Sequence, residues 1–337
     1  MYSIIRQILF TLPPEKAHHF TISSLKSLRL LPGAQSLLHS IFFRQNPVQH
    51  MGITFPNRIG LAAGLDKDGV AADLFHHLGF GFVEIGTVTP KAQPGNPKPR
   101  LFRIPKDKAL INRMGFNNDG LEKVIHHLQR YQNRNFVLGG NIGKNTITPN
   151  EKAIEDYLEC LEGLYPWVDY LVLNVSCPNI QNLSQLQNAD ELGALMAEMS
   201  SFRMQQVKYK PMLVKLSPDL TDENIEQSIS LVHTCGFDGV IFSNTTVTRD
   251  QLSISSTQIT QIGQGGLSGK PLLNRNLSKI SRIKLLLNDK TLIGCGGILT
   301  ENDAKQYLDA GADLIQVYTG FIYSGPSLIK KIAALQK

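Results

Sequence analysis

Short runs of apolar residues alternate with amphipathic stretches from residue 57 to the end of the chain. Within the runs, apolar and polar positions mostly do not alternate, which is typical of strands buried on both faces of a parallel sheet. The pattern predicts eight strands, at residues 59–63, 82–86, 136–140, 170–175, 212–216, 240–242, 292–295 and 314–317.

One unit of this pattern occurs three times in closely similar form, at residues 78–87, 235–244 and 310–319. Each copy has a glycine that ends a helix, a short turn, an apolar strand and a small polar residue at its tenth position. The repetition favours an α/β fold of the (β/α)8 TIM barrel type over two doubly wound domains. Segments 98–115 and 263–269 are predicted to be longer loops at the mouth of that barrel.

The first 45 residues have a helical pattern instead. Apolar residues at positions 4, 5, 8, 9 and 12 form one stripe, and a second helix is predicted from Glu15 until Pro32-Gly33 ends it. Five basic residues and one acid give this segment +4 of the chain's net charge of +6. Two such helices either lie on an anionic membrane surface or cap the main domain. We therefore divide the chain into an N-terminal helical extension, residues 1–45, and a barrel domain, residues 46–337.

Composition narrows the class of protein. With 42% hydrophobic and 18% charged residues, the chain of 337 residues can bury a full core, and no run of 18 apolar residues predicts a membrane-spanning helix. The net charge of +6 does not indicate a nucleic-acid partner.

The apolar stretch 8–10 is too short for a signal peptide. Four cysteines without a CxxC pair indicate a reducing cytosol and no zinc site. Histidine pairs at 18–19, 76–77 and 126–127 are expected to be solvated rather than metal ligands.

Each predicted strand is followed by polar or glycine-rich residues. Because the carboxyl ends of the strands carry the chemistry in (β/α)8 barrels, these residues predict a ligand-lined mouth. In chain order they are Ala63, Gly64, Leu65, Asp66, Lys67, Thr87, Asn141, Asn174, Val175, Ser176, Cys177, Pro178, Asn179, Lys215, Ser243, Asn244, Thr245, Gly294, Cys295, Gly296, Gly297, Tyr318, Thr319 and Gly320.

The glycine-rich turns after the seventh and eighth strands predict a phosphate cradle, because backbone N–H groups there can approach an anion closely. The chain has no P-loop and no GxGxxG motif after its first strand, so the phosphate is expected to belong to a cofactor in the barrel mouth. Lys67 and Lys215 follow buried strands, where a lysine either meets an anionic ligand or pairs with a neighbouring acid. Cys177 is either a buried structural thiol or a group that moves a proton.

Ten motifs of the chain, in their sequence and order, resemble the dihydroorotate dehydrogenase family over nearly the whole length. They are GLAAGLDKDG, EIGTVTPKAQPGNPKPRLFR, LINRMGFNN, NIGKN, NVSCPN, VKLSPDL, SNTT, GGLSGKPL, GGI and GFIYSGP. The N-terminal segment, with PPEKAHHF, resembles the quinone-dependent, membrane-associated class of that family. The soluble class lacks such a segment.

The resemblance implies an FMN-containing (β/α)8 barrel that oxidises dihydroorotate to orotate, the redox step of pyrimidine synthesis. It implies that Cys177 takes a proton from C5 of the substrate while hydride leaves C6 for flavin N5, and that Lys215 stabilises the reduced flavin. The implied FMN contacts are Ala63, Gly64, Leu65, Asp66, Lys67, Thr87, Asn141, Asn174, Lys215, Ser243, Gly269, Gly297, Tyr318 and Thr319. The implied substrate contacts are Lys67, Asn112, Arg113, Met114, Gly115, Phe116, Asn174, Asn179, Asn244 and Thr245.

The resemblance also implies a quinone as electron acceptor, His18 and Arg103 at the mouth of a quinone tunnel, and a peripheral position on the cytoplasmic face of the cell membrane. The quinone class usually has Ser where this chain has Cys177, and Cys is usual in the soluble class. Two alternatives stay open: the same chemistry with a soluble acceptor such as fumarate, and a phosphate- or FMN-binding barrel without turnover. The apolar N-terminal stripe argues against the first, and Lys67, Cys177 and Lys215 argue against the second.

Overall fold

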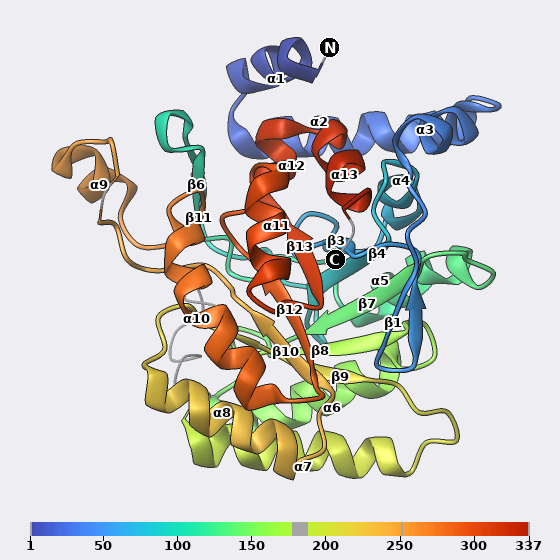
Figure 1. Cartoon of the computed structure of the whole chain (residues 1–337), viewed down its shortest axis with the longest axis vertical. Helices are drawn as coiled ribbons and strands as arrows, with labels where there is room; N and C mark the ends of the chain where they lie inside the picture. Colours follow the sequence, from blue (N-terminus) through green and yellow to red (C-terminus); the bar gives the residue numbers. More distant parts are fainter. Residues whose placement is uncertain (1, 177–187, 251, 336–337) are drawn as a thin grey trace.

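Eight parallel strands close into a barrel in the computed structural model, which describes residues 2–176, 188–250 and 252–335 (Figure 1). Around the barrel the order is β10-β12-β13-β3-β4-β7-β8-β9. The strands are β3 (Ile59–Leu61), β4 (Phe82–Val88), β7 (Val137–Ile142), β8 (Tyr170–Asn174), β9 (Met212–Leu216), β10 (Gly239–Phe242), β12 (Thr291–Cys295) and β13 (Leu314–Val317). Each coincides with one predicted apolar run, so the predicted (β/α)8 barrel is confirmed.

Helices surround the barrel and bury one face against it. In α8, for example, the side chain of Thr221 caps the first turn, and Ile225, Ile229 and Val232 are buried at helical spacing. The helices that follow the first barrel strand are α4 (Ala72–His77), α5 (Leu121–Leu128), α6 (Ala153–Leu164), α7 (Ala189–Met204), α8 (Asp222–Thr234), α9 (Ser256–Ile262), α10 (Leu272–Leu287), α11 (Glu301–Asp309), α12 (Thr319–Ser324) and α13 (Pro326–Ala333), with the short 3₁₀ turns η2 (Pro105–Asp107), η3 (Gln129–Tyr131) and η4 (Asn150–Lys152).

A β-hairpin closes the amino-terminal end of the barrel. Its strands are β1 (Val48–His50) and β2 (Ile53–Phe55), which pair antiparallel. The ring of Phe55 is fully buried and meets the ring of Phe82, at the start of β4, edge to face at 5.2 Å. With this end filled by side chains, the opposite end is left for a ligand.

The two segments predicted as long loops instead contain a three-stranded sheet, so the prediction of loops was wrong, although both segments do lie at the mouth of the barrel. The strands are β5 (Leu101–Ile104), β6 (Ala109–Asn112) and β11 (Gly266–Gly269), in the order β11-β6-β5. The pairing joins Gly266 with Asn112 and Gly269 with Ala109, residues that lie far apart in the sequence. Local periodicity does not reveal a ladder between a short glycine-containing strand and such a remote partner.

Three helices, rather than the two predicted, precede the barrel. They are α1 (Tyr2–Thr11), α2 (Pro14–Ser27), which continues into the 3₁₀ turn η1 (Leu28–Leu30), and α3 (Ala34–Phe42). Pro32-Gly33 does follow the end of the second helix, but Gly33 adopts a φ of 77° and lets the chain turn and begin α3 at once. We call residues 2–42 the N-terminal lobe. It lies at one end of the molecule, away from α6, α7 and α8 (Figure 1).

The N-terminal lobe is attached to the barrel both by apolar side chains that pack against the core, such as Leu25 and Phe42, and by polar side chains. Tyr2 donates a hydrogen bond to the carbonyl of Ile322 at 2.6 Å, Arg6 donates to that of Tyr323 at 2.7 Å, and Arg29 pairs with Asp73. Other apolar side chains of the lobe face outward: Ile4, Ile8 and Leu37 are each more than 60% exposed. The lobe therefore packs on the barrel and at the same time presents an apolar surface. None of the described helices is both long and apolar enough to cross a membrane.

The prediction that the histidine pairs are solvated was wrong for His76 and also for His18, whose pKa burial lowers as well. His76 is buried, its Nδ1 lies 2.9 Å from the carbonyl oxygen of Phe80, and its ring stacks on Phe136. The physical reason is its place on α4, where Ala72, Phe75 and His76 form one helical face toward the core. Burial, with smaller contributions from His77 and His39, lowers the pKa of His76 to about 4.

Candidate active site

A cavity opens at the carboxyl ends of the barrel strands, bordered on one side by β6 and β11. Most of the residues predicted from the sequence line it, although they come from segments that span the whole barrel. These residues are Ala63, Gly64, Lys67, Thr87, Asn112, Met114, Gly115, Phe116, Asn174, Lys215, Ser243, Asn244, Thr245, Gly269, Gly297, Tyr318 and Thr319.

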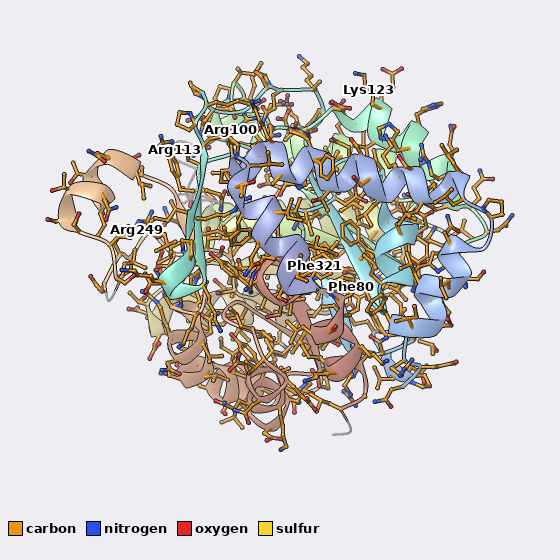
Figure 2. The ribbon with its side chains drawn as sticks, turned by 90° about the horizontal axis from the view of Figure 1, so that it is seen from above. Phe80, Arg100, Arg113, Lys123, Arg249 and Phe321 are labelled. Carbon is orange, nitrogen blue, oxygen red and sulfur yellow. The ribbon has the colours of Figure 1, made fainter. Side chains whose placement is uncertain are left out.

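Several predicted residues are placed differently. The Leu65 side chain packs in the core, and the Asp66 carboxylate accepts hydrogen bonds from two backbone N–H groups just before α4, both at 2.8 Å. The Arg113 guanidinium donates to two backbone carbonyls and lies over the ring of Phe102, near Arg100 (Figure 2). Its side chain is not part of the cavity lining. Cys177 and Asn179 lie outside the described residues.

Three side chains from neighbouring strands form a chain of hydrogen bonds at the base of the cavity. Asn174 donates to the Thr87 hydroxyl at 2.8 Å, and that hydroxyl donates to the Asn141 side-chain oxygen at 2.6 Å. Asn174 and Asn141 also contact each other directly at 3.3 Å. Asn141 is fully buried and lies behind the cavity wall, so it acts on the site through Thr87 and Asn174.

A carboxylate missed by the sequence analysis lies beneath this chain. Glu84 points inward from β4 with no exposed surface and accepts hydrogen bonds from Asn141 at 2.8 Å and Gln316 at 2.6 Å. The Lys215 ammonium lies 3.5 Å from it and also lines the cavity. Of the two possibilities for Lys215, the structure shows the ion pair with a neighbouring acid, and it leaves the ammonium at the cavity wall.

The segment after β10 joins the same network on the opposite side. Asn244 donates to the Ser176 hydroxyl at 2.9 Å and to the Asn174 side-chain oxygen at 3.3 Å. Its own side-chain oxygen accepts from the Thr245 N–H at 2.9 Å. Side-chain amides from β8 and the β10 loop thus face one cavity, where they offer both donors and acceptors to a polar ring.

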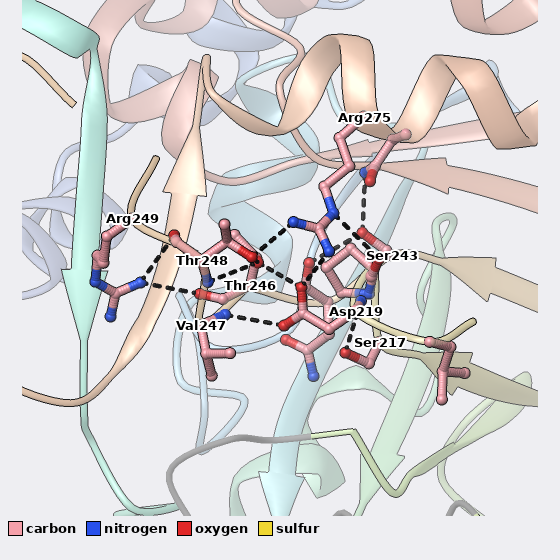
Figure 3. A network of polar contacts seen from close by, with 12 residues as sticks. Ser217, Asp219, Ser243, Thr246, Val247, Thr248, Arg249 and Arg275 are labelled. Atoms are coloured by element: carbon pink, nitrogen blue, oxygen red, sulfur yellow. Dashed lines mark hydrogen bonds and ion pairs between the residues drawn. The ribbon is translucent and has the colours of Figure 1, made fainter. Parts of the chain in front are cut away.

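A second network of polar contacts holds the segment after β10 in place (Figure 3). The Asp219 carboxylate accepts hydrogen bonds from the Thr246 hydroxyl at 2.5 Å and the Val247 N–H at 2.9 Å, and it pairs with Arg275 of α10 at 2.8 Å. Arg275 in turn donates to the Thr248 hydroxyl at 2.7 Å. The loop after β9, the loop after β10 and helix α10 are therefore held together next to Asn244 and Thr245.

Lys67 borders the cavity on the side of the N-terminal lobe. Its ammonium donates to the Asn117 side-chain oxygen. Burial, and then the nearby charge of Lys67, lower the pKa of His18 in α2 to about 4. The imidazole of His18 is therefore neutral at pH 7, and α2 lies close to the part of the site that Lys67 occupies.

Glycines line the opposite part of the cavity. They are Gly269, Gly296, Gly297 and Gly320. The first three have φ values between 78° and 106°, a conformation that side chains rarely allow. Beside them Ser268 and Thr319 share a hydrogen bond of 2.8 Å. Exposed backbone together with hydroxyl groups suits an anion such as a phosphate.

Cys295, Gly296 and Gly320, which were also predicted as strand-end residues, line the cavity too. The lining further includes residues that the sequence analysis did not select: Ala62, Ser268, Leu272, Ile298, Gln316 and Val317. Most are neighbours of selected residues. A signal was available for Gln316, the single polar residue of β13, and for Glu84, the single charged residue of β4. No group of three or more His, Cys, Asp or Glu that could hold a metal occurs within residues 2–176, 188–250 and 252–335.

A closed barrel of parallel strands with a polar cavity at their carboxyl ends is the architecture of the (β/α)8 barrel enzymes. Comparison with known proteins is more specific, because residues 47–335 match the family model described as dihydroorotate dehydrogenase.

Curated relatives span the whole chain. The dihydroorotate dehydrogenase (quinone) of Christiangramia forsetii is 46% identical over 334 residues, which cover 98% of this chain and 96% of that protein. The protein of the same name from Idiomarina loihiensis is 45% identical over 344 residues, covering 99% of both chains. The ligand-free dihydroorotate dehydrogenase of Eimeria tenella superposes with a TM-score of 0.85 at 36% identity, covering 95% of this chain and 93% of that one. This chain belongs to the dihydroorotate dehydrogenase family, among its quinone-type members, and is an oxidoreductase.

Proposed function

We propose that this protein oxidises dihydroorotate to orotate and transfers the electrons through FMN to a membrane quinone. The observation that carries the proposal is the continuous network from the Lys215 ammonium through Glu84, Asn141, Thr87 and Asn174 at the base of a glycine-rich cavity. The family assignment supports the same reaction, because the curated relatives bear the name dihydroorotate dehydrogenase (quinone).

The residues present fit FMN. The glycines at 269, 296, 297 and 320 suit its phosphate, and apolar groups such as Ala63, Phe116 and Leu272 provide surface for the flavin rings. Lys215 and the amides of β8 and the β10 loop suit the polar pyrimidine edge. When bound, FMN supplies the hydride acceptor for C6 of dihydroorotate and the electron store for the quinone step.

The residues proposed for the substrate combine one cation with several amides. Lys67 neutralises the substrate carboxylate, while Asn112, Asn174, Asn244 and Thr245 match the ring carbonyl and N–H groups, since all of them line the cavity. Asn179 is proposed for the same task from its motif alone. Cys177, from the same NVSCPN motif, is proposed as the base that takes the proton from C5.

We propose the N-terminal extension, residues 1–45, as the part that meets the membrane and admits the quinone, ahead of the catalytic barrel domain, residues 46–337. Its outward apolar side chains and its +4 charge suit the surface of an anionic bilayer. His18 and Arg103 lie on this side: Arg103 donates to the carbonyl of Leu12 at 2.7 Å and stacks over Phe10. The protein would then sit peripherally on the cytoplasmic face of the cell membrane.

The experiment that tests this function is anaerobic spectroscopy of the purified protein. We expect a yellow protein with one FMN per chain, bleached by dihydroorotate and reoxidised by a ubiquinone or menaquinone analogue. A protein that neither contains nor takes up FMN would contradict the proposal. Reoxidation by fumarate but not by quinone would instead favour the soluble-acceptor alternative.

A further inference from the structure

Glu84 is a buried acid of the network at the site, and the proposed reaction gives it no step of its own. It lies in the middle of β4, with 0% of its surface exposed. Its side chain contacts three cationic or amide groups, at distances of 2.8 Å for Asn141, 2.6 Å for Gln316 and 3.5 Å for Lys215. Gln316 and Lys215 line the cavity, and Asn141 lies directly behind it.

Glu84 and Lys215 are two charged side chains that are buried in contact with each other. A single charge at either position would be costly in the barrel interior, whereas an ion pair with additional hydrogen bonds is tolerated. Two amide donors and an ammonium satisfy an ionised carboxylate, and the carboxylate limits where the Lys215 ammonium can point. Since Lys215 is in register with Asn174 of β8 and with Ile241 of β10, its backbone is fixed on both sides.

Glu84 also determines how Asn141 is oriented. The Asn141 NH2 group donates to Glu84, so its oxygen faces the opposite way and accepts from Thr87 and Asn174. A reversed amide would place NH2 against the Thr87 hydroxyl and the Asn174 NH2. The acceptor-only carboxylate therefore sets the direction of the hydrogen bonds that reach the cavity through Asn174.

From these contacts we propose that Glu84 is a positioning residue that holds Lys215 and Asn141 against the cofactor and lowers the redox potential of the bound FMN. The inference rests on the proposed FMN function. Reduction adds negative charge at the flavin pyrimidine, which the Lys215 ammonium stabilises. The fixed negative charge of Glu84 behind Lys215 offsets part of that stabilisation, so that reduced FMN still releases its electrons to the quinone.

The test is the FMN midpoint potential of the full-length holoprotein, measured by dye equilibration for the wild type and Glu84→Gln. This substitution keeps the size of the side chain and an acceptor for Asn141, and it removes the charge. We expect the midpoint potential of Glu84→Gln to be more positive by at least about 30 mV. For a two-electron couple, this shift means that the protein's affinity for reduced FMN rises tenfold relative to its affinity for oxidised FMN. The midpoint potential of Glu84→Asp should differ from that of the wild type by less than about 30 mV, because aspartate retains the negative charge.

Tyr170→Phe is the matched control, since Tyr170 is another fully buried polar residue inside the barrel and its hydroxyl is uncharged at neutral pH. It should leave the potential unchanged. An equal shift in Tyr170→Phe, an unchanged or lower potential in Glu84→Gln, or a Glu84→Gln protein that fails to fold or to bind FMN in either redox state would each overturn the inference. A wild-type protein that takes up no FMN would refute the proposed function itself, so the two failures are distinguishable.

Discussion

The guanidinium of Arg100 binds the carboxylate of Glu15, with Nη2–Oε1 at 2.7 Å and Nε–Oε1 at 3.2 Å. Glu15 begins the first turn of α2, and Arg100 directly precedes β5, so this ion pair ties the N-terminal lobe to the sheet beside the cavity. The side chains are only 7% and 13% exposed, which distinguishes the pair from weak surface ion pairs. Figure 2 shows Arg100 beside the N-terminal helices.

Glu15→Gln should loosen α2. Burial alone would raise the pKa of Glu15, but the hydrogen bond and charge of Arg100, aided by Lys98 and His19, lower that pKa below its usual value. Removing one member of a buried pair costs about 3 kcal/mol, so amide hydrogen exchange in α2 should accelerate on the order of a hundredfold. Exchange in α8, far from the lobe, serves as the internal control. Unchanged exchange in α2 would show that the lobe does not depend on this pair.

Acid should destabilise the fold through His76. Because burial lowers the pKa of His76 to about 4, the folded state resists protonation that the unfolded chain accepts near 6.5. The contribution of neutral His76 to the free energy of unfolding is fully present above about pH 6.5. It is lost as the pH falls from about 6.5 toward about 4, by roughly 3 kcal/mol in total. Urea unfolding at pH 7 and pH 4.5 should show this loss in the wild type and a smaller loss in His76→Gln. The exposed His126→Gln is the control and should behave as the wild type.

The barrel strands could be predicted because a strand that is buried on both faces has a local sequence pattern, an unbroken run of apolar residues. The polar strand ends followed from the same reasoning, which is why Thr87, Asn174 and Lys215 could be selected from the sequence alone. The sheet β11-β6-β5 was not predicted, since β5 and β6 are short strands of one hairpin and β11 joins them only across a long separation in the sequence. A pairing between Gly266 and Asn112 leaves no periodic signal in either segment.

Two buried polar residues, Glu84 at the site and His76 away from it, were also missed in the sequence, although weaker signals existed. Glu84 stands in an apolar run, and only the barrel geometry shows that it meets Lys215 from β9. His76 shares a helical face with Ala72 and Phe75, and this spacing outweighs the polarity that a histidine pair suggests. In both cases the neighbours that make burial tolerable are supplied by other elements of the fold.

Arg275→Met should weaken catalysis without removing the cofactor. The substitution breaks the contacts to Asp219 and Thr248 that hold the loop carrying Asn244 and Thr245. Small displacements of binding groups reduce rates strongly, so kcat/KM for dihydroorotate should fall roughly tenfold to a hundredfold. FMN content should stay at the wild-type level. Arg282→Met, which breaks an exposed ion pair on the same helix, is the control, and an equal loss there would rule out a specific effect of the loop.

The double substitution Ile4→Ser and Ile8→Ser should reduce binding to membranes. Both side chains are more than 60% exposed on α1, and burying one such side chain contributes about 1.5 kcal/mol or more. We expect at least about a tenfold weaker association with vesicles containing phosphatidylglycerol, measured by co-sedimentation. Leu285→Ser, on α10 and 81% exposed in the wild type, controls for loss of apolar surface in general. If both proteins lose binding equally, α1 is not the contact surface.

Cys177→Ala should slow the reductive half-reaction selectively. A positioned general base contributes roughly 10²- to 10⁴-fold, and a thiol with an ordinary pKa near 8.5 is a few per cent ionised at pH 7. Anaerobic stopped-flow bleaching by dihydroorotate should therefore slow by that factor, while FMN and orotate still bind, because other residues make those contacts. Cys177→Ser should keep part of the rate and need a higher pH, since a hydroxyl ionises less readily than a thiol. Cys235→Ser, at a half-buried thiol on another element, should bleach as fast as the wild type. Near-normal bleaching by Cys177→Ala would eliminate Cys177 as the base.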